Sequence, residues 1–156
     1  MIKILMVCTG NICRSPMAEG LMREKSKQAG LGVVVDSCGF EPFHLNDPPD
    51  DRAIYEMKKH GIDIANHTMR LFRQADFDLF DFIYVMDQSH YRNVIRYARS
   101  ESDRKKVDYI MNAAGHGNNR HVPDPYYGRQ SDFETTYSLL DQATDAIINE
   151  LSKRNR

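Results

Sequence analysis

The feature that most constrains this chain is the stretch Cys8–Pro16, which joins an apolar segment to a helical pattern. The preceding run, Ile2–Val7, is short, apolar and partly β-branched, as in a strand buried on both faces of a parallel sheet. The following residues, Met17–Lys27, place their apolar side chains on one face, as an amphipathic helix does. Pro16 suits the first helical turn, where its missing N–H costs nothing. The stretch is therefore predicted to be a tight loop between a strand and a helix.

Segments typical of strands and of helices alternate along the rest of the chain. Further strands are predicted at Val33–Val35, Phe82–Met86 and Val107–Met111. Further helices are predicted to start at the capping residues Asp50-Asp51, Ser89 and Ser131-Asp132. Strands that alternate with helices form right-handed βαβ units and hence a parallel sheet. At 156 residues, the chain is expected to be a single α/β domain, residues 1–156.

Composition excludes several classes of function. The formal net charge of -1 gives no support for a nucleic acid or an anionic membrane as partner. No apolar run approaches the roughly 20 residues that a membrane span needs. The first residues enter strand-like sequence without the pattern of a secretory signal, so a cytoplasmic location is expected. The chain has 3 cysteines, none at zinc-finger spacing with histidines, which argues against a disulfide scaffold and a structural zinc site.

The loop has the composition of an anion site. A loop that ends a strand and opens a helix directs several backbone N–H groups at one point, which suits a phosphate group. Gly10 and Asn11 tolerate the positive φ that such a loop requires. Arg14 adds a planar, two-pronged donor for two phosphate oxygens. The loop lacks the Gly-Lys-Ser/Thr ending of nucleoside-triphosphate sites.

Cys8 stands at the end of the predicted strand, inside this anion site. A thiol near a helix N-terminus and an arginine loses its proton readily, and Ser15 is placed to donate a hydrogen bond to the thiolate. A thiolate in a phosphate site can attack phosphorus, forming a cysteinyl-phosphate that water then hydrolyses. The carboxyl ends of parallel strands meet at one edge of a sheet, so Ser37 and Asp87 are expected beside Cys8.

The reaction also needs an acid that protonates the leaving oxygen. Asp124 is the candidate, because it lies between two prolines in a loop that precedes the last predicted helix. Taken alone, an Asp-Pro pair is more often a turn opener. The chemistry of the Cys8 loop is what gives Asp124 its predicted role, first as general acid and then as general base.

In these residues the chain resembles the low-molecular-weight protein tyrosine phosphatases. The resemblance covers nearly the whole chain and rests on Val7–Pro16, Asp36-Ser37, Pro48–Asp50, Gly61-Ile62 with His67, Met86-Asp87 and Asp124–Tyr127. It implies a three-layer α/β sandwich, with a four-stranded parallel sheet flanked by helices and a phosphate-binding loop after the first strand. It implies neither a metal nor a cofactor. The implied partners are phosphotyrosine-containing protein substrates, with a tyrosine kinase among the candidates; the resemblance does not decide the oligomeric state.

The resemblance also implies roles for individual residues. Cys8 matches the family's nucleophile, Arg14 its phosphate-binding arginine and Asp124 its general acid. The implied phosphate-binding residues are Thr9, Gly10, Asn11, Ile12, Cys13, Arg14 and Ser15, and the implied supports of the loop are Asn11, Ser15, Ser37 and His67. The implied substrate pocket consists of Ile12, Phe43, His44, Asp47, Tyr126 and Tyr127. Cys13 matches a cysteine that can form a reversible disulfide with Cys8 under oxidation, and it can equally pack beneath the loop.

The segment after the Asp-Ser pair departs from the family pattern. Many bacterial members carry Ala-Gly-Thr there and a tryptophan in the next loop, where this chain has Cys38-Gly39-Phe40 and Phe43-His44. The aromatic residues of this loop either fold back onto the core or line the mouth of the pocket. Cys38 is either a buried apolar residue or an additional oxidisable thiol near the site.

Three other functions share such a loop. An arsenate reductase needs further cysteines that relay electrons, and none follows Cys38. A protein arginine phosphatase is disfavoured, because relatives of that kind have threonine in place of Ile12 and phenylalanine in place of the tyrosine pair. A non-catalytic phosphate-binding or thiol-redox module would not need Asp124. Hydrolysis of aryl phosphates is therefore the prediction, with Tyr126 and Tyr127 forming an apolar slot for a flat phenyl ring.

Overall fold

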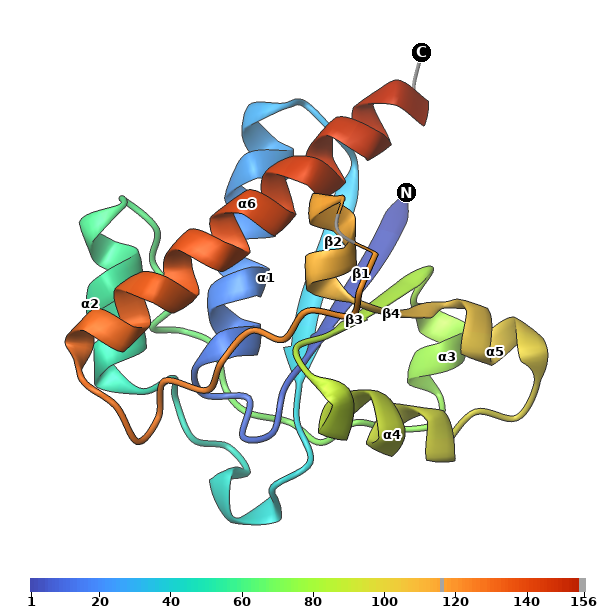
Figure 1. The fold of residues 1–156 in the computed structure, drawn as a ribbon, viewed down its shortest axis with the longest axis horizontal. Coiled ribbons are helices and arrows are strands. Elements are labelled where there is room, and N and C mark those ends of the chain that lie inside the picture. Colours follow the sequence, from blue (N-terminus) through green and yellow to red (C-terminus); the bar gives the residue numbers. More distant parts are fainter. Residues whose placement is uncertain (116, 155–156) are drawn as a thin grey trace.

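The computed structural model describes residues 1–115 and 117–154, and a sheet of four parallel strands lies at its centre (Figure 1). The strands are β1 (Ile2–Val7), β2 (Val33–Cys38), β3 (Phe82–Val85) and β4 (Val107–Tyr109). The helices are α1 (Arg14–Gln28), α2 (Asp51–Lys59), α3 (Asp76–Leu79), α4 (Gln88–Arg96), α5 (Glu101–Lys105) and α6 (Gln130–Arg154), with 3-10 turns η1 (Pro42–His44) and η2 (Ile110–Ala114). Within the described ranges, no helix is both long and apolar enough to cross a membrane. The predicted fold class, a parallel sheet between layers of helices, is confirmed.

The strand order, β2-β1-β3-β4, determines where the functional loops converge. β1 pairs in parallel with β2 on one side and β3 on the other, with Val7 opposite both Cys38 and Val85. The chain therefore leaves β1 toward one edge of the sheet and leaves β3 toward the other. Where the connections from two neighbouring strands run to opposite edges of the sheet, at a topological switch point, the two loops diverge and leave a crevice beyond the carboxyl ends of the strands. Cys8 is the first residue of the loop that follows β1.

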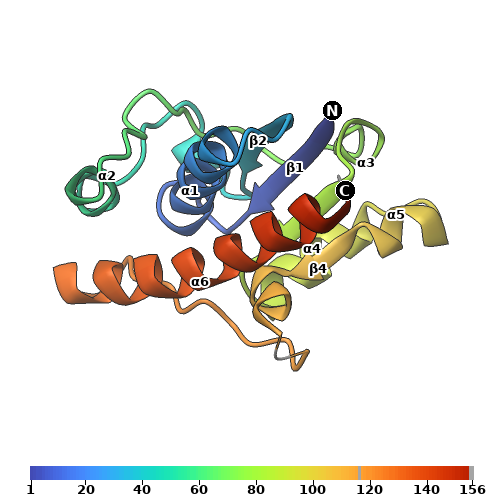
Figure 2. The ribbon, with the colours of Figure 1, turned by 90° about the horizontal axis from the view of Figure 1, so that it is seen from above.

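Helices cover both faces of the sheet, and alternate residues of β1 belong to two cores. Ile4 and Met6 pack in a cluster with residues of α1 and α6, whereas Leu5 and Val7 pack in a second cluster with residues of α3 and α4. Figure 1 shows α1, α2 and α6 on one side of the sheet and α3, α4 and α5 on the other. Figure 2 shows α6 running past α1 from the region of α2. Burial on both faces explains why β1 is apolar along most of its length.

Several boundaries differ from those that the sequence predicts. β2 continues beyond Val35 to Cys38, β3 ends at Val85 instead of Met86, and α6 already begins at Gln130. β4 ends at Tyr109, and the next residues form η2 instead of continuing the strand to Met111. α4 begins at Gln88 and is capped by Asp87 rather than by Ser89, because the backbone of Asp87 is extended and its carboxylate accepts a hydrogen bond from His90 N–H at 3.2 Å. The earlier cap matters for function, because it fixes the Asp87 carboxylate at the end of β3.

Gly20 marks a close approach between α1 and the segment that follows α2. A Cβ at this position would lie 2.6 Å from Ile64 Cγ2 and 3.2 Å from Ile62 Cγ2. Gly20→Ala should destabilise the protein by about 1 kcal/mol, because overpacking costs about 1–3 kcal/mol while the better helix propensity of alanine returns about 1 kcal/mol. Urea unfolding measures the difference. Gly32→Ala is the control, since a Cβ there would meet nothing within 4 Å, and an equal response of the two variants would contradict tight packing at Gly20.

Candidate active site

The loop after β1 wraps around the sulfur of Cys8. Cys8 Sγ accepts hydrogen bonds from the backbone N–H groups of Asn11 at 3.3 Å and Ser15 at 3.4 Å, and it lies 2.9 Å from Ser15 Oγ. Because α1 begins at Arg14, the Ser15 N–H belongs to the first turn of that helix. Two backbone donors and one hydroxyl group therefore converge on the sulfur at the N-terminal end of α1.

The tight course of the loop depends on two backbone positions. Asn11 has a φ of 55°, in the left-handed region that asparagine tolerates better than most residues. Gly39, beside the loop, has no space for a side chain, because a Cβ there would lie 2.7 Å from Thr9 O and 2.9 Å from Asn11 N. The sequence Cys38-Gly39-Phe40 therefore contains glycine where the loop packs directly against the chain leaving β2.

A hydrogen-bonded network lies beneath the loop. Asn11 Nδ2 donates to Ser15 Oγ at 2.7 Å, and Asn11 Oδ1 accepts from His67 Nε2 at 2.9 Å. Ser37 Oγ lies 3.3 Å from the same histidine nitrogen and donates to Glu19 Oε1 at 2.7 Å. The structure thus brings the four residues predicted to support the loop into one network and adds Glu19 to it.

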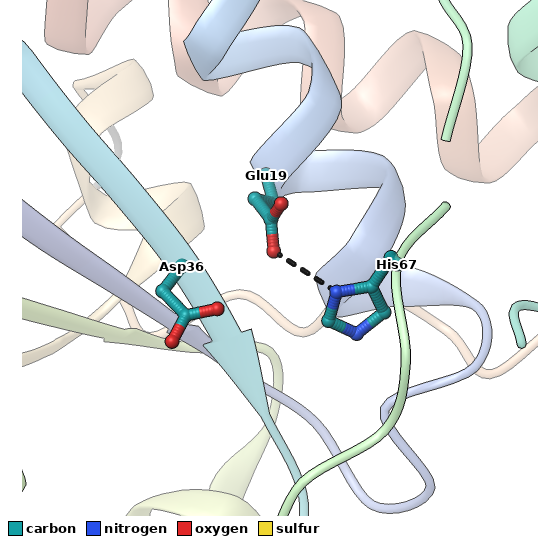
Figure 3. A group of neighbouring side chains, drawn as sticks. All are labelled: Glu19, Asp36 and His67. Carbon is teal, nitrogen blue, oxygen red and sulfur yellow. Dashed lines mark ion pairs between the residues drawn. The ribbon is translucent and has the colours of Figure 1, made fainter. Parts of the chain in front are cut away.

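Glu19, Asp36 and His67 also form a compact group of residues that are common metal ligands (Figure 3). One donor atom of each lies within 4.8 Å of the others, and Glu19 Oε1 lies 3.4 Å from His67 Nδ1. Burial lowers the pKa of His67. Arg23 pairs with Glu19, and Arg70 Nε donates to Asp36 at 2.9 Å. Both carboxylates therefore already face guanidinium groups, which supply the positive charge that a cation would bring. We interpret the group as part of the network beneath the loop and assign no metal to it.

Arg14 is buried, with 3% of its side chain exposed, and fixed partners surround its charge. Nη1 donates to Asp87 Oδ2 at 3.0 Å and to Val122 O at 2.9 Å, while Nη2 lies 3.5 Å from Asp124 Oδ2. Burial alone would raise the pKa of Asp87, but the charge that His90 acquires in acid, with the hydrogen bonds from Ser89 and Arg14, lowers it to about 2. Asp87 is therefore ionised over the neutral range and holds the guanidinium in place.

His90 packs behind the loop from α4. Its Nε2 lies 2.6 Å from Thr9 Oγ1 and 3.4 Å from Arg14 Nη2, and 1% of the residue is exposed. Burial, followed by the nearby Arg14 charge, lowers the pKa of His90 to about 4. The imidazole is therefore neutral near neutral pH.

A pocket of about 210 Å³ opens above Cys8. Its lining includes all three predicted catalytic residues and five predicted substrate-pocket residues: Cys8, Arg14 and Asp124, with Ile12, Phe43, His44, Tyr126 and Tyr127. Asp47 is not part of this lining, and its carboxylate instead lies 3.2 Å from His44 Nδ1. Glu41 lines the pocket although the sequence did not indicate it. Asp124 is held at the pocket by the backbone N–H of Tyr126, which donates to its Oδ1 at 3.1 Å.

The residues that depart from the family pattern divide between core and pocket. Phe40 packs on Phe72, with 5.6 Å between ring centroids, whereas Phe43 is 74% exposed at the pocket. Cys38 is fully buried in the cluster on the α3 and α4 side of the sheet, and Cys8 belongs to the opposite cluster. Burial raises the pKa of the Cys38 thiol. These observations favour a packing role for Cys38.

Sequence reasoning missed Glu19 and His90. Glu19 is nearly fully buried on α1, as are its apolar neighbours Ala18 and Met22. His90 is buried on the same face of α4 as Val94, which follows four residues later. A polar residue on the buried face of a helix needs a partner, so this pattern is a signal that the sequence does contain. The partners themselves come from other segments, and helical spacing does not name them.

Fold and site together define a class of protein, in which a phosphate-sized loop at the end of the first parallel strand closes around a cysteine. The family model described as "Low molecular weight phosphotyrosine protein phosphatase" matches residues 3–156. The low molecular weight phosphotyrosine protein phosphatase of Schizosaccharomyces pombe is 40% identical over 142 residues, which cover 89% of this chain and 90% of that protein. The chain belongs to the low molecular weight phosphotyrosine protein phosphatase family, a family of phosphoric monoester hydrolases.

Solved structures agree with this assignment. A protein tyrosine phosphatase from Entamoeba histolytica, crystallised with Hepes in its active site, superposes with a TM-score of 0.91 over 100% of both chains at 29% identity. Wzb from Vibrio vulnificus, in complex with benzylphosphonate, gives a TM-score of 0.84 at 28% identity and covers 96% of this chain and 98% of its own. The similarity extends over the whole sheet and its helices.

The buried, neutral His90 makes stability depend on pH. Its folded pKa of about 4 is depressed, whereas an unfolded histidine titrates near 6.5, so the unfolded chain binds more protons between these values and stability falls as pH falls. Between pH 7 and pH 5 the wild-type chain should lose about 2 kcal/mol more unfolding free energy than His90→Gln, which cannot titrate. Urea unfolding at the two pH values measures this. Identical losses in both proteins would show that His90 is not neutral in the fold.

Proposed function

We propose that this chain hydrolyses phosphotyrosine on proteins through a phosphate bound covalently to Cys8. The supporting observation is that Cys8, Arg14 and Asp124 line one pocket, and that the Cys8 sulfur accepts hydrogen bonds from the backbone N–H groups of Asn11 and Ser15. The family assignment supports the reaction, and the geometry supports the residues to which we assign it.

In the first step, the Cys8 thiolate attacks phosphorus and the bond from phosphorus to the tyrosine oxygen breaks. Arg14 and the loop N–H groups bind the phosphoryl oxygens as negative charge moves across them. Nη1 of Arg14 is occupied by Asp87 and Val122, and Nη2 also faces His90, so Nε and the remaining hydrogen of Nη2 are the donors left for two phosphate oxygens. Protonated Asp124 gives its proton to the departing phenolate, which leaves as a neutral phenol.

In the second step, water attacks the phosphorus of the cysteinyl-phosphate on the face that the phenol has left. Asp124, now a carboxylate, removes a proton from this water, and the bond from phosphorus to Cys8 Sγ breaks. The products are inorganic phosphate and the Cys8 thiolate. The donors from Asn11, Ser15 N–H and Ser15 Oγ stabilise this thiolate as the leaving group, so the same contacts serve both steps.

An aryl substrate suits the walls of the pocket. Ile12 and the rings of His44 and Tyr126 line the slot, and these two rings meet edge to face with their centroids 6.3 Å apart. A flat phenyl ring gains from apolar and edge-to-face contacts in such a slot. The complex of the Vibrio vulnificus relative with benzylphosphonate, a ligand with one phenyl ring, is consistent with this choice.

We further propose a cytoplasmic location and protein substrates that include a tyrosine kinase. Cys8, Cys13 and Cys38 are all free thiols, and a thiolate nucleophile needs a compartment that keeps it reduced. Exposed aromatic residues such as Phe43 and Tyr127 surround the pocket and offer contacts to a polypeptide around the phosphotyrosine.

Substitution of the nucleophile and substitution of the acid should change the activity on two substrates in different ways. Cys8→Ser should abolish phosphate release from both a phosphotyrosine peptide and 4-nitrophenyl phosphate. Asp124→Asn should lower kcat/KM for the peptide about 100-fold, and far less for 4-nitrophenyl phosphate, because nitrophenolate leaves without protonation. Phosphate release assays give both numbers. Asp132→Asn, outside the pocket, is the matched control, and full activity of Cys8→Ser would refute the mechanism.

The two loop cysteines should make oxidation reversible. Peroxide oxidises the Cys8 thiolate to a sulfenic acid, and attack by Cys13 sulfur then releases water and forms a disulfide, which a thiol reductant opens again. Burial raises the pKa of Cys13, so the disulfide should form faster as pH increases. Cys13→Ser should recover less than half as much activity as wild type when reductant is added after peroxide. Equal recovery in the two proteins would count against the protective disulfide.

A further inference from the structure

The buried imidazole of His90 has a contact pattern that the proposed mechanism does not use. Its Nε2 lies 2.6 Å from Thr9 Oγ1, on the phosphate-binding loop, and 3.4 Å from Arg14 Nη2. Within the described residues, Nδ1 is buried without a hydrogen bond of good geometry, although Asp87 Oδ1 is 3.3 Å away. A fully buried polar side chain at a functional loop needs an explanation.

Donor and acceptor chemistry determines which nitrogen carries the proton. A guanidinium nitrogen only donates, so the Nε2 that faces Arg14 must be an acceptor. The proton of the neutral ring is then on Nδ1, which faces the Asp87 carboxylate. Thr9 Oγ1 therefore donates its hydrogen to Nε2. The hydrogens therefore point in one direction: the Thr9 hydroxyl hydrogen points to His90 Nε2, and the Nδ1 hydrogen of His90 points toward the Asp87 carboxylate.

We propose that His90 is a positioning residue, which acts as a neutral acceptor and holds both Thr9 and Arg14 in the geometry that binds phosphate. This inference rests on the proposed function, because the phosphate site is the one that these residues would serve. Asp87 has two roles in it. One carboxylate oxygen binds Arg14 at 3.0 Å, and the other lies 3.3 Å from His90 Nδ1, where its negative charge favours the tautomer with the hydrogen on Nδ1.

The position of Thr9 shows why such a contact matters. Thr9 O accepts hydrogen bonds from Phe40 N–H at 2.8 Å and Glu41 N–H at 3.2 Å, so the chain leaving β2 holds the backbone of the loop from one side. His90 holds the hydroxyl of the same residue from α4. The loop is therefore fixed by elements on both sides of β1 before any ligand binds. Binding donors that are already in place lose no free energy to reorganisation when the phosphate arrives.

The charges around His90 explain why it must stay neutral. Arg14 from the loop side disfavours a cation there, whereas Asp87 and, more distantly, Asp124 favour one, and His121 from the segment before Asp124 adds a further titratable group. A second proton on Nε2 would face the Arg14 guanidinium and remove the acceptor that Thr9 uses. Burial keeps that proton off, as the low pKa of His90 indicates.

Two substitutions of His90 separate the acceptor from the rest of the ring. Glutamine reaches the place of Nε2 and can present an oxygen there to Thr9, whereas asparagine reaches only the place of Nδ1. We expect His90→Asn to lower kcat/KM for 4-nitrophenyl phosphate about 10-fold, the effect of one lost hydrogen bond, and to raise the inhibition constant of inorganic phosphate by a similar factor. His90→Gln should lose clearly less. His60→Asn, at the residue that follows α2, is the matched control outside the pocket.

A double-mutant cycle then tests whether His90 acts through Thr9. Thr9→Val should also lower kcat/KM about 10-fold, and Thr9→Val with His90→Asn should lose about 10-fold, not the 100-fold of independent effects. Additive losses, or equal losses for His90→Asn and His90→Gln, would overturn the proposal. A general weakening of the fold would lower activity in all variants in proportion to their stability, which urea unfolding measures alongside.

The nitrogen chemical shifts of His90 provide a test that needs no activity. In the uniformly ¹⁵N-labelled wild-type protein at neutral pH, Nδ1 should have the shift of a protonated ring nitrogen and Nε2 that of an unprotonated one, and Thr9→Val should move the Nε2 signal. A protonated Nε2 would overturn the proposal. If the wild-type protein released no phosphate from aryl phosphates, the proposed function would fail, and these shifts would still decide whether His90 accepts from Thr9.

Discussion

The hydrogen bonds from the backbone N–H groups of Asn11 and Ser15 to Cys8 Sγ require the loop to turn back within a few residues of β1. That turn puts Asn11 at positive φ, which costs about 1–2 kcal/mol for a residue with a side chain. The side-chain amide of Asn11 offsets this cost, because it forms hydrogen bonds with both Ser15 Oγ and His67 Nε2. The turn also brings the loop so close to Gly39 that no side chain fits there. A few short contacts around one sulfur thus determine residues on three separate segments.

The second constraint is charge. A buried guanidinium without partners would be strongly destabilising, so the position of Arg14 depends on the fixed carboxylate of Asp87 and the carbonyl of Val122. Asp87 is available because it caps α4 at the end of β3, and β3 lies directly beside β1 in the sheet. The strand order therefore determines which carboxylate balances the charge of Arg14. It places a helix cap from one βα unit against the arginine of another.

The fold and the centre of the site could be predicted because they depend on strand and helix patterns in short stretches of sequence. The rest could not, because it depends on side-chain contacts between residues that are distant in sequence. The loop could be recognised because Cys8 and Arg14 lie between a strand pattern and a helix pattern, and the chemistry of such a loop demands an acid, which led to Asp124. Glu19 and His90 were missed because their partners lie far away in sequence, at Ser37 and Thr9. The cap of α4 was misplaced by two residues for a related reason, since Ser and Asp are both good caps and backbone geometry chose between them.

The contact between Arg14 and Asp124 links the two halves of the proposed reaction. Without a ligand, Nη2 of Arg14 lies 3.5 Å from the Asp124 carboxylate, so the acid shares the arginine that the phosphate will need. A phosphate dianion in the loop would compete for that nitrogen and repel a carboxylate beside it, which favours the protonated form of Asp124. The protonated form is the one that the first step requires. After the phenol leaves, Asp124 is a carboxylate again and can take a proton from water, so one arginine couples the charge of the substrate to the protonation of the acid.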